Sequence, residues 1–168
     1  LLVPFDTALR IEQRYLTSLF QTTETAMMIR SLFVSLQELN KGARRPQNVE
    51  PTNFKKIGVL GAGFMGSGIA YVTAKAGIPV VLLDRDVPAA EKGKAHSEKL
   101  VTEAIAKGRA KPEDKDKLLS LITPTDDYAL LDGCDLVIEA VFEDSEVKKT
   151  AVEKAEAVLK PAATFASN

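Results

Sequence analysis

The sequence predicts an α/β protein built on a doubly wound, mostly parallel sheet and preceded by a short α-helical segment. From residue 55 onward, short apolar runs alternate with longer helical stretches, which is the pattern of buried parallel strands separated by crossover helices. The first apolar run leads into a Gly-x-Gly-x-x-Gly loop at residues 61–66. The second apolar run ends on an acidic residue, Asp84.

The chain before this α/β region forms a separate part. Apolar residues at helical spacing predict two helices within residues 1–45, with Asp6 and Thr23 as candidate N-caps. Residues 46–54 are polar, contain two prolines and have no periodicity, so we expect a linker there. The predicted organisation is therefore a helical segment, a linker and an α/β domain over residues 55–168.

Five strands are expected in the α/β domain. They cover residues 56–60, 79–83, 121–124, 136–141 and 163–166. The expected helices run from the glycine loop to about residue 76, from 88 to 107, from 112 onward, and from 145 to 159. Gly77 is placed to end the first of these helices as a left-handed cap.

Each glycine of the loop has its own expected role. Gly61 permits a tight turn out of the strand, Gly63 lets a pyrophosphate approach the backbone without an intervening Cβ, and Gly66 lets the helix pack close to the sheet. Unpaired N–H groups and the positive end of the helix dipole would face the phosphates. This strand–loop–helix unit predicts a Rossmann-type domain that binds a dinucleotide.

Asp84 indicates which dinucleotide. It ends the second strand 18 residues after Gly66, where a carboxylate accepts hydrogen bonds from the adenosine ribose hydroxyls. Its charge would repel a 2′-phosphate, which favours NAD over NADP, although the neighbouring Arg85 weakens this preference. The alternative is that the loop is only a tight turn and Asp84 a solvated strand end.

Acidic and basic side chains gather after the fourth predicted strand. Glu139 and Glu143 flank its end, where parallel sheets place their ligand crevice, and Lys148 lies about one helical turn beyond Glu143. On spacing alone the simpler interpretation is an acidic, solvated loop whose charges favour the start of the next helix.

The candidates for catalysis are few. His96, the single histidine, lies among charged residues on an expected exposed helix face, and Cys134 precedes a buried strand as a small packing residue. The sequence therefore contains no convincing acid–base pair for hydride chemistry. It also has no cluster of Cys and His with the spacing of a metal site.

Composition narrows the possible partners. There are 22 basic and 23 acidic residues, so the net charge of -1 gives no overall field that would attract nucleic acid or an anionic membrane. No apolar run approaches the roughly 20 residues needed to cross a bilayer. One cysteine and no export signal lead us to expect a reducing, cytoplasmic compartment, bacterial by default, although an organelle is also possible.

Four separated motifs resemble the NAD-binding domain of the L-3-hydroxyacyl-CoA dehydrogenases. They are residues 57–70 around the glycine loop, residues 81–84, residues 135–143 and the closing residues 165–168, which resemble the start of the family's Ser-Asn-Thr-Ser segment. The helices and linker before them resemble the end of the enoyl-CoA hydratase/isomerase part of the bifunctional fatty acid oxidation α-subunit. The resemblance implies that the chain is a fragment of that protein.

The resemblance also implies a set of cofactor-binding residues. Gly61, Gly63 and Gly66 would hold the pyrophosphate, and Asp84 the adenosine ribose. Glu143 and Lys148 would hold the nicotinamide half, with Asn168 beside the nicotinamide and the substrate. The remaining members of the expected NAD site are Phe64, Met65, Arg85, Ala140 and Val141.

The family oxidises the 3-hydroxyl of an acyl-CoA to a ketone in fatty acid β-oxidation, with a histidine and a glutamate taking the proton. The resemblance places those two residues beyond Asn168, so we expect this fragment to bind NAD without catalysing the reaction. It implies a 3-hydroxyacyl-CoA substrate for the parent protein and a thiolase subunit as a possible partner. Two alternatives remain, a regulatory module that senses NAD or NADH, and a dehydrogenase of another hydroxy acid.

Overall fold

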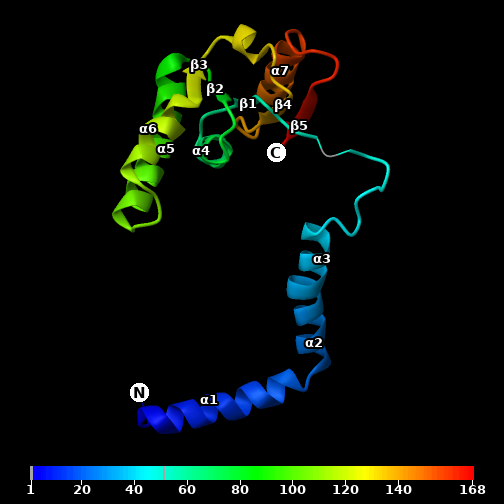
Figure 1. Ribbon diagram of the computed structural model, residues 1–168, viewed down its shortest axis with the longest axis vertical. Helices are drawn as coiled ribbons and strands as arrows, with labels where there is room; N and C mark the ends of the chain where they lie inside the picture. Colours follow the sequence, from blue (N-terminus) through cyan, green and yellow to red (C-terminus); the bar gives the residue numbers. More distant parts are fainter. Residues whose placement is uncertain (1, 51) are drawn as a thin grey trace. The chain divides into compact units, whose positions relative to one another are not determined.

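The computed structural model describes residues 2–50 and 52–168 and divides into two compact units, Leu1–Pro51 and Thr52–Asn168 (Figure 1). The first unit is helical and the second contains a sheet with helices.

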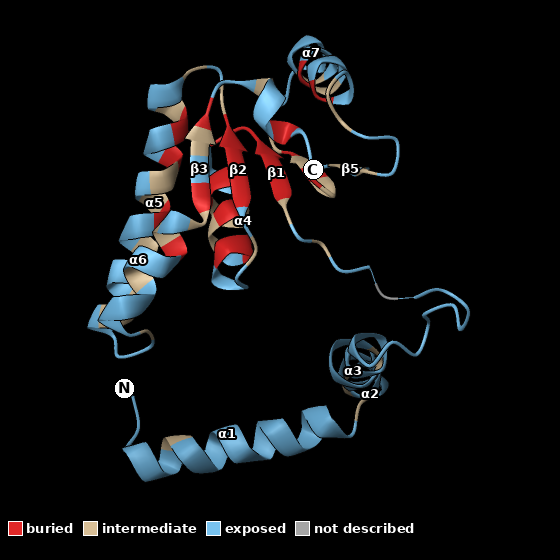
Figure 2. Ribbon diagram, turned by 45° about the horizontal axis from the view of Figure 1, so that its top comes forward, coloured by how far each residue is buried: buried red, intermediate tan, exposed pale blue. Residues whose placement is uncertain are grey.

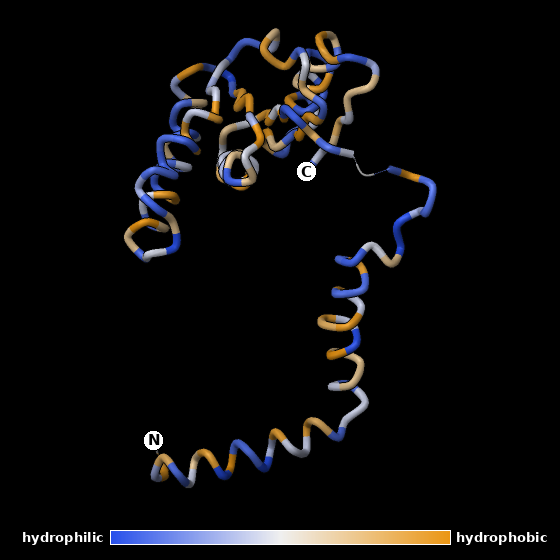
Figure 3. The backbone as a smooth tube through the Cα atoms, viewed as in Figure 1, coloured by the Kyte–Doolittle hydropathy of each residue, from blue (hydrophilic) through white to orange (hydrophobic). Residues whose placement is uncertain are grey.

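The first unit contains one straight helix and one helix of mixed type. Helix α1 spans Phe5–Phe20; α2 (Thr23–Ile29) continues into the π-helical turns of η1 (Arg30–Ser35) and then into α3 (Leu36–Asn40). Among the described residues of these helices none is buried, although apolar and polar positions alternate along them (Figure 3). Their apolar faces therefore lack a core of their own.

The predicted N-caps of these helices are each wrong by one or two positions. Pro4 is the N-cap of α1, so Asp6 lies in the first turn, where its charge still favours the helix dipole. Thr22, and not Thr23, caps α2, and its hydroxyl accepts a hydrogen bond from the Thr25 N–H at 3.3 Å.

The second unit is built on a parallel five-stranded sheet with the order β3-β2-β1-β4-β5. Its strands are β1 (Ile57–Leu60), β2 (Val80–Leu83), β3 (Ile122–Thr125), β4 (Leu136–Glu139) and β5 (Thr164–Ser167). This order is that of the Rossmann fold, with the chain direction across the sheet reversing between β1 and β4. The predicted doubly wound α/β fold is confirmed.

The fourth strand is two residues shorter than predicted. Val141 donates its N–H to the Glu139 side chain at 2.8 Å, so that it does not continue the ladder. The chain therefore leaves the sheet after Ala140, whose N–H still bonds to the Leu60 carbonyl of β1 at 2.8 Å.

Four helices and a short 3₁₀ turn connect the strands. They are α4 (Phe64–Lys75), α5 (Val87–Ala106), α6 (Pro112–Ser120), η2 (Tyr128–Leu131) and α7 (Ser145–Glu156). Gly77 follows α4 with φ 83°, as predicted for a left-handed cap. The 3₁₀ turn was not predicted, because Tyr128–Leu131 is too short for its own periodicity.

Buried residues concentrate in the strands of the sheet and in the parts of the helices that cover it (Figure 2). One cluster includes Ile57, Val59 and Leu82 and is covered by residues of α4, α5 and α6. The other includes Leu60, Leu131 and Val137 and is covered by α7 and η2. Of the helices in the described ranges, none is long and apolar enough to cross a membrane.

Candidate functional site

The glycine loop folds back against the residue that follows β4. Gly61 has φ 92°, a conformation that favours glycine, and a Cβ there would collide with the Ala140 carbonyl. A Cβ on Gly66 would collide with the Gly61 carbonyl and would lie 3.3 Å from Val59 Cγ1. Gly66 therefore allows the start of α4 to pack on the loop itself as well as on the sheet.

Gly63 faces open space. A Cβ built on this residue meets nothing within 4 Å, and its φ of -67° is ordinary. Gly63 is the N-cap of α4, and within the part of the chain that the structure describes no side chain caps this helix end. The first-turn N–H groups and the dipole of a 12-residue helix are thus available to an anion, which fits a pyrophosphate.

Asp84 lies beside this loop, at the carboxyl end of β2. Its Oδ2 accepts a hydrogen bond from the Ala62 N–H at 2.6 Å, and its Oδ1 accepts one from the Arg85 N–H at 2.7 Å. Each carboxylate oxygen keeps a second lone pair, so the group is oriented while it retains acceptor capacity for ribose hydroxyls. The arrangement fits an adenosine ribose next to the loop.

Arg85 pairs with the aspartate that follows it. Its Nε lies 3.2 Å from Asp86 Oδ2, and its side chain is 84% exposed. Asp86 therefore partly neutralises the positive charge of Arg85, which is the charge that would attract the 2′-phosphate of NADP.

The expected crevice lies where the chain direction across the sheet reverses. Strands β1 and β4 are neighbours, with Leu60 opposite Glu139, so the glycine loop and the segment after β4 leave the same edge of the sheet. Ala140 donates its N–H to the Leu60 carbonyl at 2.8 Å and closely approaches Gly61. Open α/β sheets bind ligands outside the carboxyl ends of their strands at this kind of reversal.

A charged network borders the crevice after β4. The Lys148 ammonium lies 3.0 Å from Glu143 Oε1 and 3.5 Å from Glu139 Oε2, and it donates to the main-chain carbonyl of Asn168 at 3.0 Å. The Ser167 hydroxyl donates to Glu139 Oε2 at 2.6 Å. The structure therefore brings Glu143, Lys148 and Asn168 together; their contact with the nicotinamide half of a cofactor stays a prediction from the family resemblance.

This network changes the proton affinity of the lysine. The hydrogen bond with Glu143 raises the pKa of Lys148 above its ordinary value; burial opposes this rise, and the charges of Glu139 and Glu143 add to it. Lys148 is therefore a cation at neutral pH, able to face an acceptor on a ligand.

The interpretation of Glu139 as part of a solvated acidic loop is wrong. Its side chain is 1% exposed, whereas that of Glu143 is 85% exposed. Asp144 fulfils the expected helix-start role, because its carboxylate accepts hydrogen bonds from the N–H groups of Glu146 and Val147, each at 3.0 Å.

The other expected contacts lie around the loop or away from it. Phe64 is 83% and Met65 50% exposed at the start of α4, while Ala140 and Val141 are half-buried behind the loop. His96 is half-buried on α5, with its ring centroid 6.3 Å from that of Phe64. The histidine is therefore next to the glycine loop, and not on the fully exposed face that its charged neighbours indicate.

Cys134 is buried among apolar residues in the second cluster, as expected for a packing residue. Burial raises the pKa of its thiol. Groups of three or more His, Cys, Asp or Glu that could hold a metal ion do not occur among the described residues.

Gly93 carries no motif signal in the sequence, and Ser167 lies in the closing motif, which gives no sign of its contact with Glu139. A Cβ on Gly93 of α5 would lie 2.7 Å from Ala62 Cβ and 2.8 Å from its carbonyl oxygen, so this glycine lets α5 approach the loop. Ser167 bonds to Glu139 only because β5 pairs with β4 in a register that opposes the two residues. Spacing within either segment does not show these contacts.

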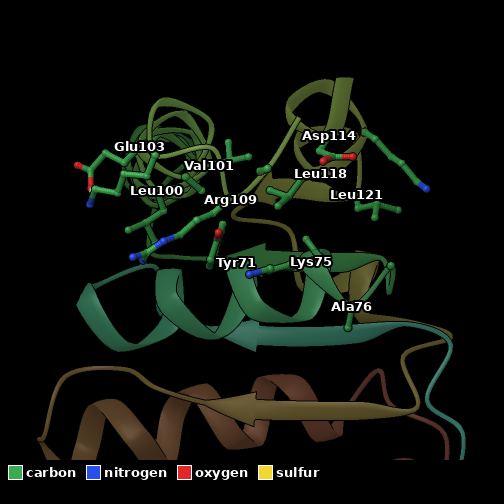
Figure 4. Close-up of a pocket in the computed structure, with 16 residues that line it drawn as sticks. Tyr71, Lys75, Ala76, Leu100, Val101, Glu103, Arg109, Asp114, Leu118 and Leu121 are labelled. Atoms are coloured by element: carbon green, nitrogen blue, oxygen red, sulfur yellow. The ribbon is translucent and has the colours of Figure 1, made fainter. Parts of the chain in front are cut away.

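A cavity of about 660 Å³ lies elsewhere, between the C-terminal part of α4, α5 and α6 (Figure 4). Lys75, Lys107, Arg109 and Glu103 are among the residues that line it, with Val101 and Leu118 as apolar members. None of the expected NAD contacts lines this cavity, because the glycine loop precedes the other end of α4.

The fold and this site define a dinucleotide-binding α/β domain. Residues 56–168 match the family described as 3-hydroxyacyl-CoA dehydrogenase, NAD binding domain. The chain belongs to this family, and NAD is the cofactor of the matched domain.

Similarity to solved structures agrees with this assignment. The chain is 31% identical to (S)-3-hydroxybutyryl-CoA dehydrogenase from Ralstonia eutropha (TM-score 0.67), covering 69% of this chain and 41% of that one. It is 36% identical to FadB2 of M. tuberculosis (TM-score 0.67), covering 70% and 41%. It is 26% identical to the dehydrogenase part of multifunctional enzyme 1 from C. elegans (TM-score 0.62), covering 72% and 27%. The matched region thus spans about two fifths of the first two relatives.

Proposed function

We propose that this chain is the NAD-binding part of an enzyme that oxidises (S)-3-hydroxyacyl-CoA to 3-ketoacyl-CoA in fatty acid β-oxidation. The observation that carries the proposal is the pairing of an open Gly63 with an oriented Asp84 at the start of α4. Family membership and the activity of the R. eutropha relative support the substrate class.

The residues of the crevice have distinct roles in this proposal. The loop of Gly61, Gly63 and Gly66, with the exposed Phe64 and Met65 beside it, receives the pyrophosphate. Asp84 accepts from the adenosine ribose, next to Arg85. The remaining contacts, to the nicotinamide half, come from Ala140, Val141, Glu143, Lys148 and Asn168.

The proton-transfer groups are proposed to lie in another part of the parent protein. His96 is the single histidine of this chain, and it lies on α5 beside Phe64. Among the described residues, no hydrogen bond or ion pair joins it to a carboxylate. Bound NAD would supply the hydride acceptor. The fragment would then orient the cofactor and leave proton removal to a histidine and glutamate elsewhere.

The N-terminal helices support a bifunctional parent. Large apolar side chains on α1 and α2 are exposed, for example Phe5 at 67%, Phe20 at 60% and Met27 at 63%. A helix with such a face needs a partner surface. In this proposal the partner surface is an upstream hydratase/isomerase domain, the linker spans residues 46–54, and a thiolase subunit completes a β-oxidation complex.

The experiment separates binding from catalysis. The 168-residue chain is titrated with NADH, followed by fluorescence, and then assayed for NADH oxidation with acetoacetyl-CoA. We expect saturable binding and no turnover. Measurable turnover would show that the proton-transfer groups lie within this chain.

A matched variant tests the loop itself. In Gly63→Val the new side chain enters open space, so the thermal midpoint should stay close to that of the parent chain, while NADH affinity should fall by more than about tenfold because the phosphates are blocked. Unchanged NADH affinity in this variant would place the cofactor elsewhere.

A further inference from the structure

Glu139 is the one charged residue among the buried side chains of the described chain. A buried carboxylate is unfavourable unless its charge and its hydrogen-bonding capacity are compensated. It ends strand β4, which pairs with β1 and β5, beside the expected nicotinamide half of the site.

The carboxylate joins three segments of the chain. Oε1 accepts from the Val141 N–H at 2.8 Å, in the segment directly after β4. Oε2 accepts from the Ser167 hydroxyl at 2.6 Å, at the end of β5, and lies 3.5 Å from the Lys148 ammonium on α7. All three partners border the same crevice.

The two carboxylates around Lys148 are not equivalent. Glu143 is 85% exposed, so water screens its pairing with the lysine and its side chain has room to move. Glu139 is held by two hydrogen bonds in addition to the ion pair and is screened much less. The buried carboxylate can therefore fix the position of the ammonium, while the exposed one is free to exchange partners.

We propose that Glu139 is a positioning residue for the nicotinamide half of NAD. It fixes the Lys148 ammonium, and Ser167 locks the carboxylate in place from β5. Glu139 does not contact the cofactor, because its side chain is buried beneath these partners. The inference rests on the proposed function, since it takes Lys148 as a cofactor contact.

The experiment compares two ligands that share one half. ADP carries the adenosine and pyrophosphate, whereas NADH adds the nicotinamide ribose and base. In Glu139→Gln of the 168-residue chain the amide keeps the size of the side chain and accepts from the Val141 N–H, but it loses the charge that holds Lys148. We expect NADH affinity to fall about tenfold, because the charge-assisted interaction that is lost supports only the nicotinamide half of the ligand. ADP lacks that half, so its affinity should stay within about twofold.

Matched variants define what a different outcome means. Glu153→Gln removes an exposed carboxylate on the same helix as Lys148 and should leave both affinities unchanged. If Glu139→Gln does not fold, Ser167→Ala removes only the locking hydroxyl and should weaken NADH about threefold and ADP not at all. In the Lys148→Met background, Glu139→Gln should change NADH affinity by less than about twofold, because the residue acts through the lysine.

Equal weakening of ADP and NADH in Glu139→Gln would overturn the inference, because Glu139 would then stabilise only the fold. An unchanged NADH affinity in a folded Glu139→Gln variant would overturn it as well. If the unmodified chain bound NADH no more tightly than ADP, the proposed function would fail, and the inference would fail with it.

Discussion

Asp84 and Ala62 are joined by a hydrogen bond of 2.6 Å that links the end of β2 to the middle of the glycine loop. This bond uses one lone pair of the carboxylate and the Arg85 N–H uses another, which leaves one on each oxygen for a ligand. The group that would select the ribose therefore also fixes the backbone that would hold the phosphates. A substitution of Asp84 that removes this acceptor should therefore affect both the ribose and the phosphate part of adenosine diphosphate recognition.

Asp84→Asn should narrow the preference for NADH over NADPH. An asparagine oxygen still accepts from the Ala62 N–H, so the loop is retained, but the negative charge that repels a 2′-phosphate is removed. We expect NADH affinity to fall and NADPH affinity to rise, changing their ratio by about tenfold. Calorimetric titration with both ligands measures this, and Asp116→Asn, an exposed carboxylate on α6, is the control. An unchanged ratio would show that Asp84 does not face the ribose.

Gly66→Ala should destabilise the chain, whereas Gly68→Ala should not. The Cβ at position 66 overlaps the Gly61 carbonyl, so we expect a loss of about 2 kcal/mol in the free energy of unfolding together with weaker NADH binding. At position 68, on the same helix, a Cβ meets open space, and higher helix propensity should stabilise the chain by up to about 1 kcal/mol. Thermal or urea unfolding measures both. Equal effects would contradict the close packing of α4 on the loop.

Lys148 gives a pH dependence with a definite sign. Its hydrogen bond with Glu143 raises its pKa, so its contribution to stability and to NADH binding is complete below the ordinary lysine value and is lost as pH rises through the raised pKa. Titrations between about pH 9 and pH 11, around the ordinary value near 10.4, should show NADH affinity falling at lower pH in Glu143→Gln than in the unmodified chain. Glu143→Gln also removes a proposed cofactor contact and so lowers NADH affinity at every pH. The quantity to compare is therefore the pH at which the affinity falls. Coincident falls would show that the carboxylate does not act on this lysine.

The two units should be separable. A chain of residues 52–168 contains both apolar clusters and every residue of the proposed site, so NADH affinity should stay within about twofold of the full chain. The exposed apolar faces of α1 and α2 would be removed, and self-association measured by ultracentrifugation should decrease. A shortened chain that fails to fold would contradict the predicted organisation.

The parts of the site that follow from local sequence were predictable. The glycine loop and Asp84 lie within one βαβ unit, where the backbone demands at Gly61 and Gly66 leave a direct residue signature. The strands and helices of the second unit follow from their apolar patterns, and their predicted ends differ from the observed ends by at most about three residues.

The contacts made by distant segments were not predictable. Glu139 is followed within five residues by Glu143 and Asp144. Such an acidic stretch predicts side chains that are exposed to solvent. The burial of Glu139 results from β5 and α7, which pack against it only in the folded domain. The position of Gly93 against Ala62 has the same origin, since α5 meets the loop through tertiary packing.

A calorimetric titration of the 168-residue chain with NADH and with NADPH tests the central claim most directly. The account predicts saturable NADH binding at one site per chain, with NADPH at least about tenfold weaker because Asp84 opposes its 2′-phosphate. Equal affinities for the two dinucleotides, or no saturable binding of either, would contradict it.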